Sequence, residues 1–576
     1  MHEIHSVYLS FVALLLIGVQ LSRCDPTFCA RSFHSAVVGN DTLWMDGGEI
    51  RFIADDGSNK VLPYVVNATQ SIDLSKRWSN TDSNLITYYN KPVSSDPANT
   101  PPKLNDQTLW FDGTGLIQFG GALSLTPSAL KNPPPQGTWR YDIAKHSWSK
   151  QGFGGSTVQR TFEGGSAQST DGRGFALGGS VSPLTDPQFH TEGNVYQYLV
   201  EGLITLDEKS RTFTNSSTKG MNSGNTIASG YMNIIENVGA KGILVAFGGT
   251  VETAGKSLGT AGLLAEDPAQ QNKMDTISIY NIATNTWFQQ KATGDIPKWR
   301  HFGSSLVVSA QDSSSHSIYM FGGWGDYVSQ SDGSVYVLSI PSFRWIRLNQ
   351  DKTPRVKNKC LLMGQRTMLV VGGTQPTDIS QFQPAAAQCD GTSSRFAQGL
   401  GIFSLQNHTW MSSYDPADDG PYELHKQITD VIGGNAKGGA THTTPEGGFN
   451  NNALKKLFQS STSTTSSKPS MSSETSSAST TAVPPKKLSG GAIAGIVIGV
   501  IVGVALVAGI VALLIIRSRR RRTTTTNPRE LEPEASPLPK KQFVEQHPIV
   551  EADNGKQPGE LGGEHYQSMA ELPVDR

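Results

Sequence analysis

The chain contains six short runs of apolar residues between residues 29 and 411, and each run ends in a pair of glycines. Runs such as Ile243–Phe247 are continuous rather than alternating, so they predict short strands that are buried on both faces. A glycine pair at a strand end permits positive φ and close backbone approach, which suits a turn near a crowded axis. The six pairs are Gly47-Gly48, Gly120-Gly121, Gly178-Gly179, Gly248-Gly249, Gly322-Gly323 and Gly372-Gly373.

Each glycine pair is followed, after a loop, by a second strand pattern that ends in an aromatic residue. Such a residue indicates an outer strand whose ring fills the gap between neighbouring sheets. One four-stranded unit of this kind cannot bury both of its faces, whereas six units in a ring can. The aromatic residues recur about every 66 residues and are Trp78, Trp148, Phe213, Trp287, Trp345 and Trp410.

A glycine pair, a Tyr-Asp-type strand and a Trp resemble the kelch repeat, and the resemblance covers residues 29–411. It implies an all-β fold, a six-bladed kelch-type β-propeller, over residues 25–412. The third unit departs from the pattern because Phe213 stands where Trp is usual, and the first unit is one residue shorter before Trp78. Kelch repeats have a period of about 50 residues, so we expect the excess length in loops such as 181–200 and 250–275.

Residues 413–458 follow the repeats and are expected to carry short helices, one of them amphipathic and ending at Gly433-Gly434. Together with residues 25–48 and the cysteine-bearing sixth unit, this segment resembles fungal single-pass cell-surface kelch proteins. Members of that group carry a stalk and a single membrane anchor.

Two apolar segments indicate sorting to a membrane. Residues 7–19 predict the core of a signal peptide over residues 1–24; the alternative is a buried helix of the first domain. Residues 490–516 contain no charged or amide side chain, and as a helix they would span about 40 Å, against about 30 Å of hydrocarbon. The arginines that follow place the C-terminus in the cytoplasm. We therefore expect a type I protein of the plasma membrane or another secretory-pathway membrane, with its N-terminus extracellular or lumenal.

The polar segments beside the predicted membrane helix fit this topology. Residues 459–489 are rich in Ser and Thr, which suits an extended O-glycosylated stalk; the alternative is a plain flexible linker. Residues 517–576 are expected to form a disordered cytoplasmic tail. All four N-glycosylation sequons lie on the predicted outer side, at Asn40, Asn67, Asn215 and Asn407.

The charge distribution narrows the choice of partners. The net charge is -1, and no basic tract occurs before residue 500, so no nucleic-acid partner is expected. Anionic lipid is expected at the arginines Arg517, Arg519, Arg520, Arg521 and Arg522. A stripe of small residues predicts a homodimer through the membrane helix, although glycine is common in such helices generally. The stripe consists of Gly491, Gly495, Gly499 and Gly503.

The chain has four cysteines, Cys24, Cys29, Cys360 and Cys389. Cys360 and Cys389 bracket one repeat unit and would be exported to an oxidising space, so we expect a disulfide between them. Cys29 then pairs with Cys24 or stays free. The alternative is that Cys360 and Cys389 are buried free thiols.

Four arginines precede the first strand of their units at comparable positions, and they are the candidate binding residues. If ring symmetry places them around one mouth of the central channel, they offer forked donors to an acidic peptide or acidic sugar. In the alternative, each arginine bonds carbonyls or acids of a neighbouring blade. The four residues are Arg31, Arg160, Arg300 and Arg355.

We expect a cell-surface recognition or scaffold protein that binds a protein or glycan, with no catalytic residue, cofactor or metal. Galactose-oxidase-like enzymes share kelch-type blades and need two histidines, two tyrosines and a cross-linked cysteine. By the repeat pattern, His34 and His301 occupy equivalent positions, which favours a structural role. A galactose-oxidase-like enzyme and a structural role in cell-wall organisation stay open as alternatives.

Overall fold

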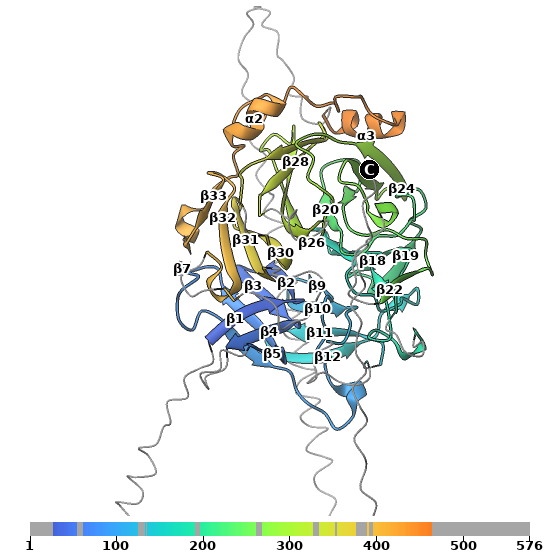
Figure 1. Ribbon diagram of the computed structural model, residues 1–576, viewed down its shortest axis with the longest axis vertical. Coiled ribbons are helices and arrows are strands. Elements are labelled where there is room, and N and C mark those ends of the chain that lie inside the picture. The colour runs from blue at the N-terminus through green and yellow to red at the C-terminus, as the bar shows by residue number, and fades with distance from the viewer. Residues whose placement is uncertain are drawn as a thin grey trace, which may run out of the picture. The chain divides into compact units, whose positions relative to one another are not determined.

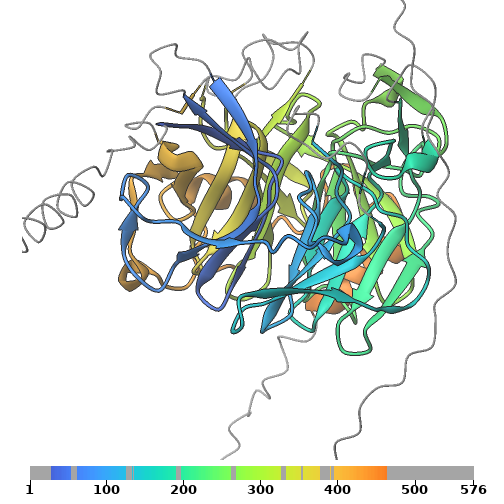
Figure 2. The same ribbon diagram turned by 90° about the horizontal axis from the view of Figure 1, so that it is seen from below.

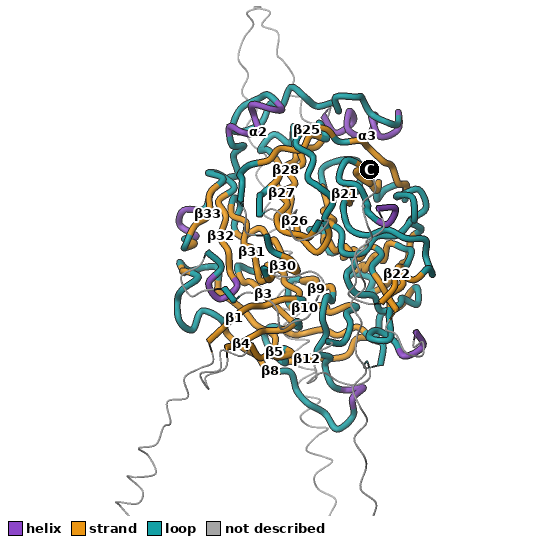
Figure 3. Tube along the Cα trace, viewed as in Figure 1, coloured by secondary structure: helices purple, strands orange, loops and turns teal. Residues whose placement is uncertain are grey.

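The structure is a computed structural model. It describes residues 27–53, 61–124, 133, 135–189, 196–260, 268–325, 333–351, 354–375, 389–390 and 395–462. Antiparallel sheets surround a common axis, and the short helices lie at the outside of the ring (Figures 1, 2 and 3).

Five separate sheets of four or five strands, blades 1 to 5 in chain order, make up most of the ring. Blade 1 consists of β2 (Ser35–Gly39), β3 (Thr42–Asp46), β6 (Ala68–Asp73) and β8 (Thr87–Asn90). Blade 2 consists of β9 (Thr108–Phe111), β10 (Gly115–Phe119), β11 (Thr138–Asp142) and β12 (Ser147–Gln151). Blade 3 consists of β13 (Gly154–Gly155), β14 (Gly165–Gln168), β15 (Arg173–Leu177), β18 (Leu203–Asp207) and β19 (Thr212–Ser216).

Blades 4 and 5 continue the same order. Blade 4 consists of β20 (Tyr231–Ile235), β21 (Ile243–Phe247), β23 (Thr276–Asn281) and β24 (Thr286–Lys291). Blade 5 consists of β25 (Thr293–Gly294), β26 (His301–Ser309), β27 (His316–Trp324), β28 (Tyr336–Ile340) and β29 (Arg344–Arg347). β21 is buried along its whole length, so the expectation from its continuous apolar run is confirmed.

The sixth repeat does not form a sheet of its own. Its strands are β30 (Val356–Met363), β31 (Thr367–Thr374), β32 (Leu400–Ser404) and β33 (Thr409–Met411). They belong to a seven-stranded sheet with β1 (Thr27–Ser32), β4 (Glu49–Ile53) and β5 (Val61–Val65). β1 pairs with β31 through Arg31 and Gly373. The expected six separate blades are therefore wrong: the structure has five.

Two of the loops that were expected to hold the excess length meet each other. The loop after Gly179 carries β16 (Ser180–Val181) and β17 (Tyr196–Leu199), and the loop after Gly249 carries β22 (Ser257–Thr260). These three strands pair into a small sheet. A further two-stranded sheet joins β7 (Trp78–Ser79) to β34 (Ser413–Tyr414).

The aromatic residues of the outer strands reach back to the preceding repeat, as expected. Trp148 Nε1 donates to Thr69 Oγ1 at 3.0 Å, and Trp345 Nε1 donates to the Met274 carbonyl oxygen at 2.9 Å. Phe213, which replaces the usual Trp, packs against Phe119 with ring centroids 5.5 Å apart. The ring contacts therefore fill the gaps between successive sheets.

Short helices cover the outer rim (Figure 1). α2 (Lys426–Ile432) ends at Gly433, whose φ of 76° confirms the expected end of the amphipathic helix. α3 (Asn452–Thr462) packs Phe458 against Phe343 and continues past the expected start of the stalk at residue 459. The single-turn helices are η1 (Pro97–Asn99), η2 (Pro187–Phe189), η3 (Pro268–Gln270), η6 (Ala397–Gly399) and η7 (Pro416–Asp418).

Several predicted segments lie outside the described residues. They are the signal peptide, most of the stalk, residues 490–516 with the stripe of four glycines, and the tail with its arginine cluster. Among the residues that are described, no helix is both long and apolar enough for a membrane crossing. The expected fold class is thus corrected to an all-β propeller with five separate blades, without a membrane-crossing helix in its described part.

Candidate functional site

The glycine pairs join each repeat to the next. In five of them the second glycine donates its N–H to a carbonyl of the following repeat, as in Gly121 to Thr161 at 2.8 Å. A Cβ on the first glycine would meet the same carbonyl; on Gly120 it would lie 2.4 Å from the Thr161 oxygen. A side chain is therefore excluded there by contact as well as by positive φ. The other four bonds are Gly48 to Leu104, Gly179 to Ile227, Gly249 to Arg300 and Gly323 to Arg355.

Every repeat has one non-glycine residue at positive φ, one to three residues after the carbonyl that lies against the glycine pair of the preceding repeat. Four backbone hydrogen bonds connect neighbouring members of this set; for example, the Asp106 N–H donates to the Phe33 carbonyl at 2.7 Å. Such φ values are uncommon outside glycine and mark a backbone held in place by its surroundings. We call the set the axial ring. Its members are Phe33, Asp106, Glu163, Ser229, Phe302 and Lys357, with φ between 51° and 61°.

Lys357 connects opposite sides of the axial ring. Its Nζ lies 2.9 Å from Asp106 Oδ2 and 2.6 Å from Glu163 Oε1, and it stands 3.8 Å from the centroid of the Phe302 ring. Burial by itself would lower the pKa of Lys357, but the two carboxylates outweigh it and the pKa is raised. A charged lysine therefore spans the axis at this end.

The four candidate arginines are all buried, with exposed fractions between 0% and 3%. Arg355 binds the Asp390 carboxylate through both Nη atoms, at 2.7 and 2.9 Å, and Arg160 donates to the Pro135 carbonyl at 2.8 Å. Arg300 donates to the Lys298 carbonyl, and burial lowers the pKa of Arg31 to about 10. Of these bonds, the one from Arg160 to Pro135 reaches a neighbouring repeat, whereas Arg355 and Arg300 bond residues of their own repeats. A binding role for the four arginines stays a prediction.

The disulfide forms between Cys29 and Cys389, whose Cα atoms are 4.2 Å apart. The expected bond between Cys360 and Cys389 is wrong. Cys29 lies on β1, which pairs with β31 and so stands beside the sixth repeat. Cys360 is a buried free thiol in the core between blade 5 and the seven-stranded sheet, and burial raises its pKa to about 12.

The other predicted positions are distributed over the surface and the core. Among the sequon asparagines, Asn40, Asn215 and Asn407 are exposed and Asn67 is half-buried. His34 follows an axial-ring residue whereas His301 precedes one. The expectation that these two histidines occupy equivalent repeat positions is therefore wrong. In the part of the chain that is described, no group of three or more His, Cys, Asp or Glu is placed to hold a metal ion.

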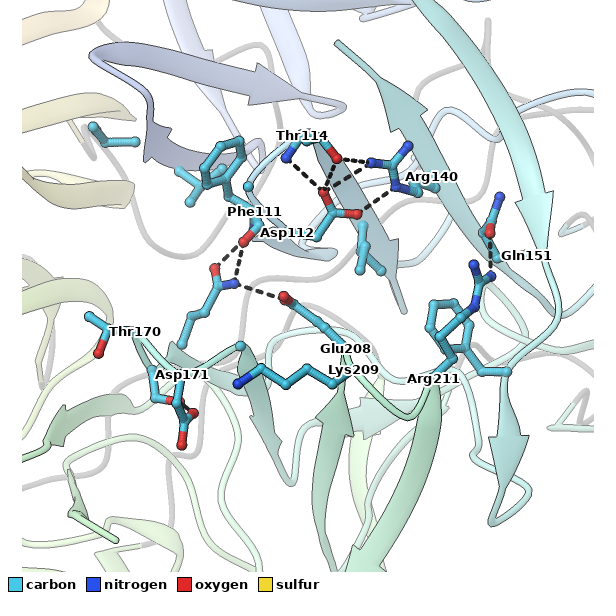
Figure 4. Close-up of a pocket in the computed structure, with 18 of the residues that line it drawn as sticks. Phe111, Asp112, Thr114, Arg140, Gln151, Thr170, Asp171, Glu208, Lys209 and Arg211 are labelled. Carbon is cyan, nitrogen blue, oxygen red and sulfur yellow. Dashed lines mark hydrogen bonds and ion pairs between the residues drawn. The ribbon is translucent and has the colours of Figure 1, made fainter. Parts of the chain in front are cut away.

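A pocket of about 850 Å³ lies at the other end of the inner strands (Figure 4). The innermost strand of each repeat begins beside the axial-ring residue of that repeat. Two of these innermost strands, β2 and β30, supply the apolar floor of the pocket through Val37, Val38, Leu361 and Leu362. Turns of blades 2 and 3 supply a charged rim. The residues that line this pocket come from four different repeats, so no single sequence motif indicates it.

Two interactions hold the wall of the pocket on the side of blade 2. Arg140 binds both oxygens of Asp112, at 2.5 and 3.0 Å, and also donates to Thr114 Oγ1 at 2.7 Å. The Gln168 side chain, from blade 3, accepts from the Phe111 N–H at 2.9 Å and donates to its carbonyl. The side-chain amide of Gln168 thus joins blade 3 to the backbone of blade 2 through two hydrogen bonds.

Glu208 has the most perturbed carboxyl group of the pocket. It lies in the turn between β18 and β19 and accepts a hydrogen bond of 2.9 Å from Gln168 Nε2. Burial, and next the charge of Asp112, raise the pKa of Glu208 to about 7. Lys209 and Arg211 lie in the same turn, and the Arg211 guanidinium stacks on Phe153 at 5.1 Å. Perturbed carboxyl groups in a cavity are typical of functional sites.

The chain is similar to known proteins both in sequence and in structure. No protein-family model matches the chain. The chain is 25% identical over 489 residues to a "Kelch repeat-containing protein" of Arthroderma benhamiae; the match covers 74% of this chain and 66% of the relative, just under two thirds of its length. The solved structure, described as "Structure of YjhT", shares 12% identity at a TM-score of 0.41 and covers 68% of this chain and 99% of that one.

Proposed function

Because the chain is a kelch-type β-propeller, we propose that it is a recognition protein that binds a partner protein outside the cell and is not an enzyme. The binding surface in this proposal is the pocket whose floor comes from β2 and β30 and whose rim comes from turns of blades 2 and 3. A propeller of this kind provides a rigid frame on which turns from different blades present side chains together.

The observation that carries the proposal is the difference between the two ends of the axis. At one end Lys357 is bonded to two carboxylates and spans the axis. At the other end the pocket has an apolar floor and a rim of charged turns, and its size is that of a cavity that accepts a side chain or a short segment. An apolar floor inside a polar rim is also the usual anatomy of a protein-binding surface.

The extracellular location is supported by two features of the described residues. The Cys29–Cys389 disulfide fits an oxidising compartment, and the sequon asparagines Asn215 and Asn407 are exposed. Asn40 is exposed too, but its Nδ2 donates to the Gly113 carbonyl at the pocket rim. Anchoring depends on residues 490–516 and stays a prediction from the sequence. Protease added to intact cells should remove the propeller and leave an epitope at Arg576 protected; loss of the epitope would contradict this orientation.

Site-specific cross-linking on intact cells tests the binding surface. A photoreactive amino acid at Thr114, on the exposed rim of the pocket, should form a saturable adduct with a partner protein. The same group at Lys426, which is exposed on α2 beside blade 5 and does not line the pocket, is the matched control and should not. Equal adducts at both positions, or none at Thr114, would contradict the pocket as the binding surface. A glycan partner would give no protein adduct.

A further inference from the structure

The charges of the pocket do not cancel when Glu208 is protonated. Asp112 is neutralised by Arg140, and Asp171 is neutralised by Arg173, whose Nε lies 2.8 Å from both of its carboxylate oxygens. Lys209 makes no salt bridge within the described residues. Arg211 donates to the neutral Gln151 and stacks on Phe153, and no carboxylate there pairs with it. When Glu208 of the same turn is protonated, two cations of a single turn are thus left over at the rim.

We propose that the pocket binds an acidic peptide segment of the partner protein, with a carboxylate held between Lys209 and Arg211 and an apolar side chain on the floor. This inference rests on the proposed function. The Arg211 guanidinium is already oriented by Gln151 and Phe153, so it loses little freedom when it binds a carboxylate with its remaining donors.

The floor favours a peptide over an acidic sugar. Val37, Val38, Leu361 and Leu362 are aliphatic and carry no polar group. Sugar hydroxyls placed over them would lose water without gaining hydrogen bonds, whereas a leucine or phenylalanine side chain gains from the same burial. The combination of a cationic rim and an aliphatic floor is therefore matched by a segment that alternates carboxylates and apolar residues.

Glu208 makes the binding dependent on pH. It neighbours the two cations in the turn, and the charged groups that face it are Asp112 from the turn of blade 2, Asp171 from the turn after β14, and Asp207 beside it. Because its pKa is about 7, it is mostly ionised at about pH 8 and mostly protonated at about pH 6. An ionised Glu208 repels an acidic ligand, so binding takes up a proton and strengthens as the pH falls.

Selection of a random-peptide phage library against the full-length protein at about pH 6 tests the proposal. Enriched peptides should carry both carboxylates and apolar residues, and Lys209→Gln or Arg211→Gln should weaken them roughly tenfold. Lys219→Gln, an equal loss of charge at an exposed lysine outside the pocket, should leave binding unchanged. Binding should be about fivefold tighter at about pH 6 than at about pH 8, and Glu208→Gln should remove this difference.

The possible failures are distinguishable. Two outcomes overturn the acidic ligand and leave the proposed function standing. In the first, the enriched peptides lack carboxylates. In the second, their binding is unchanged by Lys209→Gln and Arg211→Gln but is blocked by Thr114→Trp at the pocket rim. Binding of polygalacturonate, with the same dependence on Lys209 and no acidic peptide enriched, overturns the peptide in favour of a sugar. No enriched peptide that responds to any pocket substitution overturns both the proposed function and this inference.

Discussion

Lys357 Nζ lies 2.6 Å from Glu163 Oε1 although 194 residues separate them in the chain. The bond joins the sixth repeat to the third across the axis, and a second bond from the same ammonium reaches Asp106 in the second repeat. Both carboxylates are nearly buried, so each depends on this lysine for its charge balance.

Replacing Lys357 with methionine should therefore destabilise the propeller strongly. The substitution keeps most of the side-chain volume but leaves Asp106 and Glu163 close together without the cation that is bonded to both, which costs on the order of 3 kcal/mol. Thermal unfolding measures the effect. Lys426→Met is the matched control, because that lysine pairs with Asp430 at the surface and should change the midpoint very little. Equal midpoints for the two variants would show that the axial bridge carries no stability.

Two glycines at positive φ, Gly120 of a glycine pair and Gly113 outside any pair, separate the cost of backbone strain from the cost of steric contact. Gly120 and Gly113 both have positive φ, but a Cβ on Gly120 would lie 2.4 Å from the Thr161 oxygen, whereas a Cβ on Gly113 would meet nothing within 4 Å. Gly113→Ala should thus cost about 1 kcal/mol for its conformation alone. Gly120→Ala should cost clearly more, because the joint between blades 2 and 3 must open. Chemical unfolding of both variants decides whether steric contact or positive φ is the reason that glycine is required at Gly120.

The repeated pattern in the sequence predicts the elements within each repeat well. Strand β21, the positive φ of both glycines in each pair and the packing of the outer aromatic residues all follow from local sequence. These features depend on residues close together in the chain, where periodicity and glycine chemistry are direct guides.

Relations between distant segments could not be predicted in this way. The pairing of β1 with β31 reduces the number of separate blades and brings Cys29 to Cys389, and no local pattern indicates it. The pocket has the same origin, since its floor comes from the first and sixth repeats and its rim from the second and third. Repeat position predicts the four arginines around one mouth of the central channel, but repeat position alone does not tell whether a side chain is exposed.

The disulfide closes a separation of 360 residues, so its loss should be costly. Cys29→Ser should lower the free energy of unfolding by about 5 kcal/mol if the constraint on the unfolded chain dominates. Cys360→Ser, at the buried free thiol, is the control and should cost about 1 kcal/mol. Non-reducing peptide mapping should link the peptides of Cys29 and Cys389 and find Cys360 alkylated only after unfolding. A peptide pair of Cys360 with Cys389 would contradict the structure.

Buried histidines should make the propeller less stable in mild acid. Burial lowers the pKa of His301 to about 3 and that of His316 to about 4, well below the value of about 6.5 for an unfolded chain. Below about pH 6.5 the unfolded chain therefore binds protons that the folded protein does not, and the free energy of unfolding falls with pH. Each ring contributes about 1.4 kcal/mol per pH unit until its folded pKa is reached, or about 2 kcal/mol at pH 5.

His316→Gln isolates one of these contributions. Glutamine can keep the contact that His316 Nδ1 makes with Ser309 Oγ at 2.8 Å, but it does not take up a proton. Between about pH 6.5 and 5 the stability of this variant should fall less steeply than that of the wild type, by the equivalent of one proton. His442→Gln, which removes an exposed histidine, is the control for the substitution itself. If chemical unfolding gives His316→Gln the slope of the wild type, then His316 already binds its proton in the folded state, and its ring is not held neutral by burial.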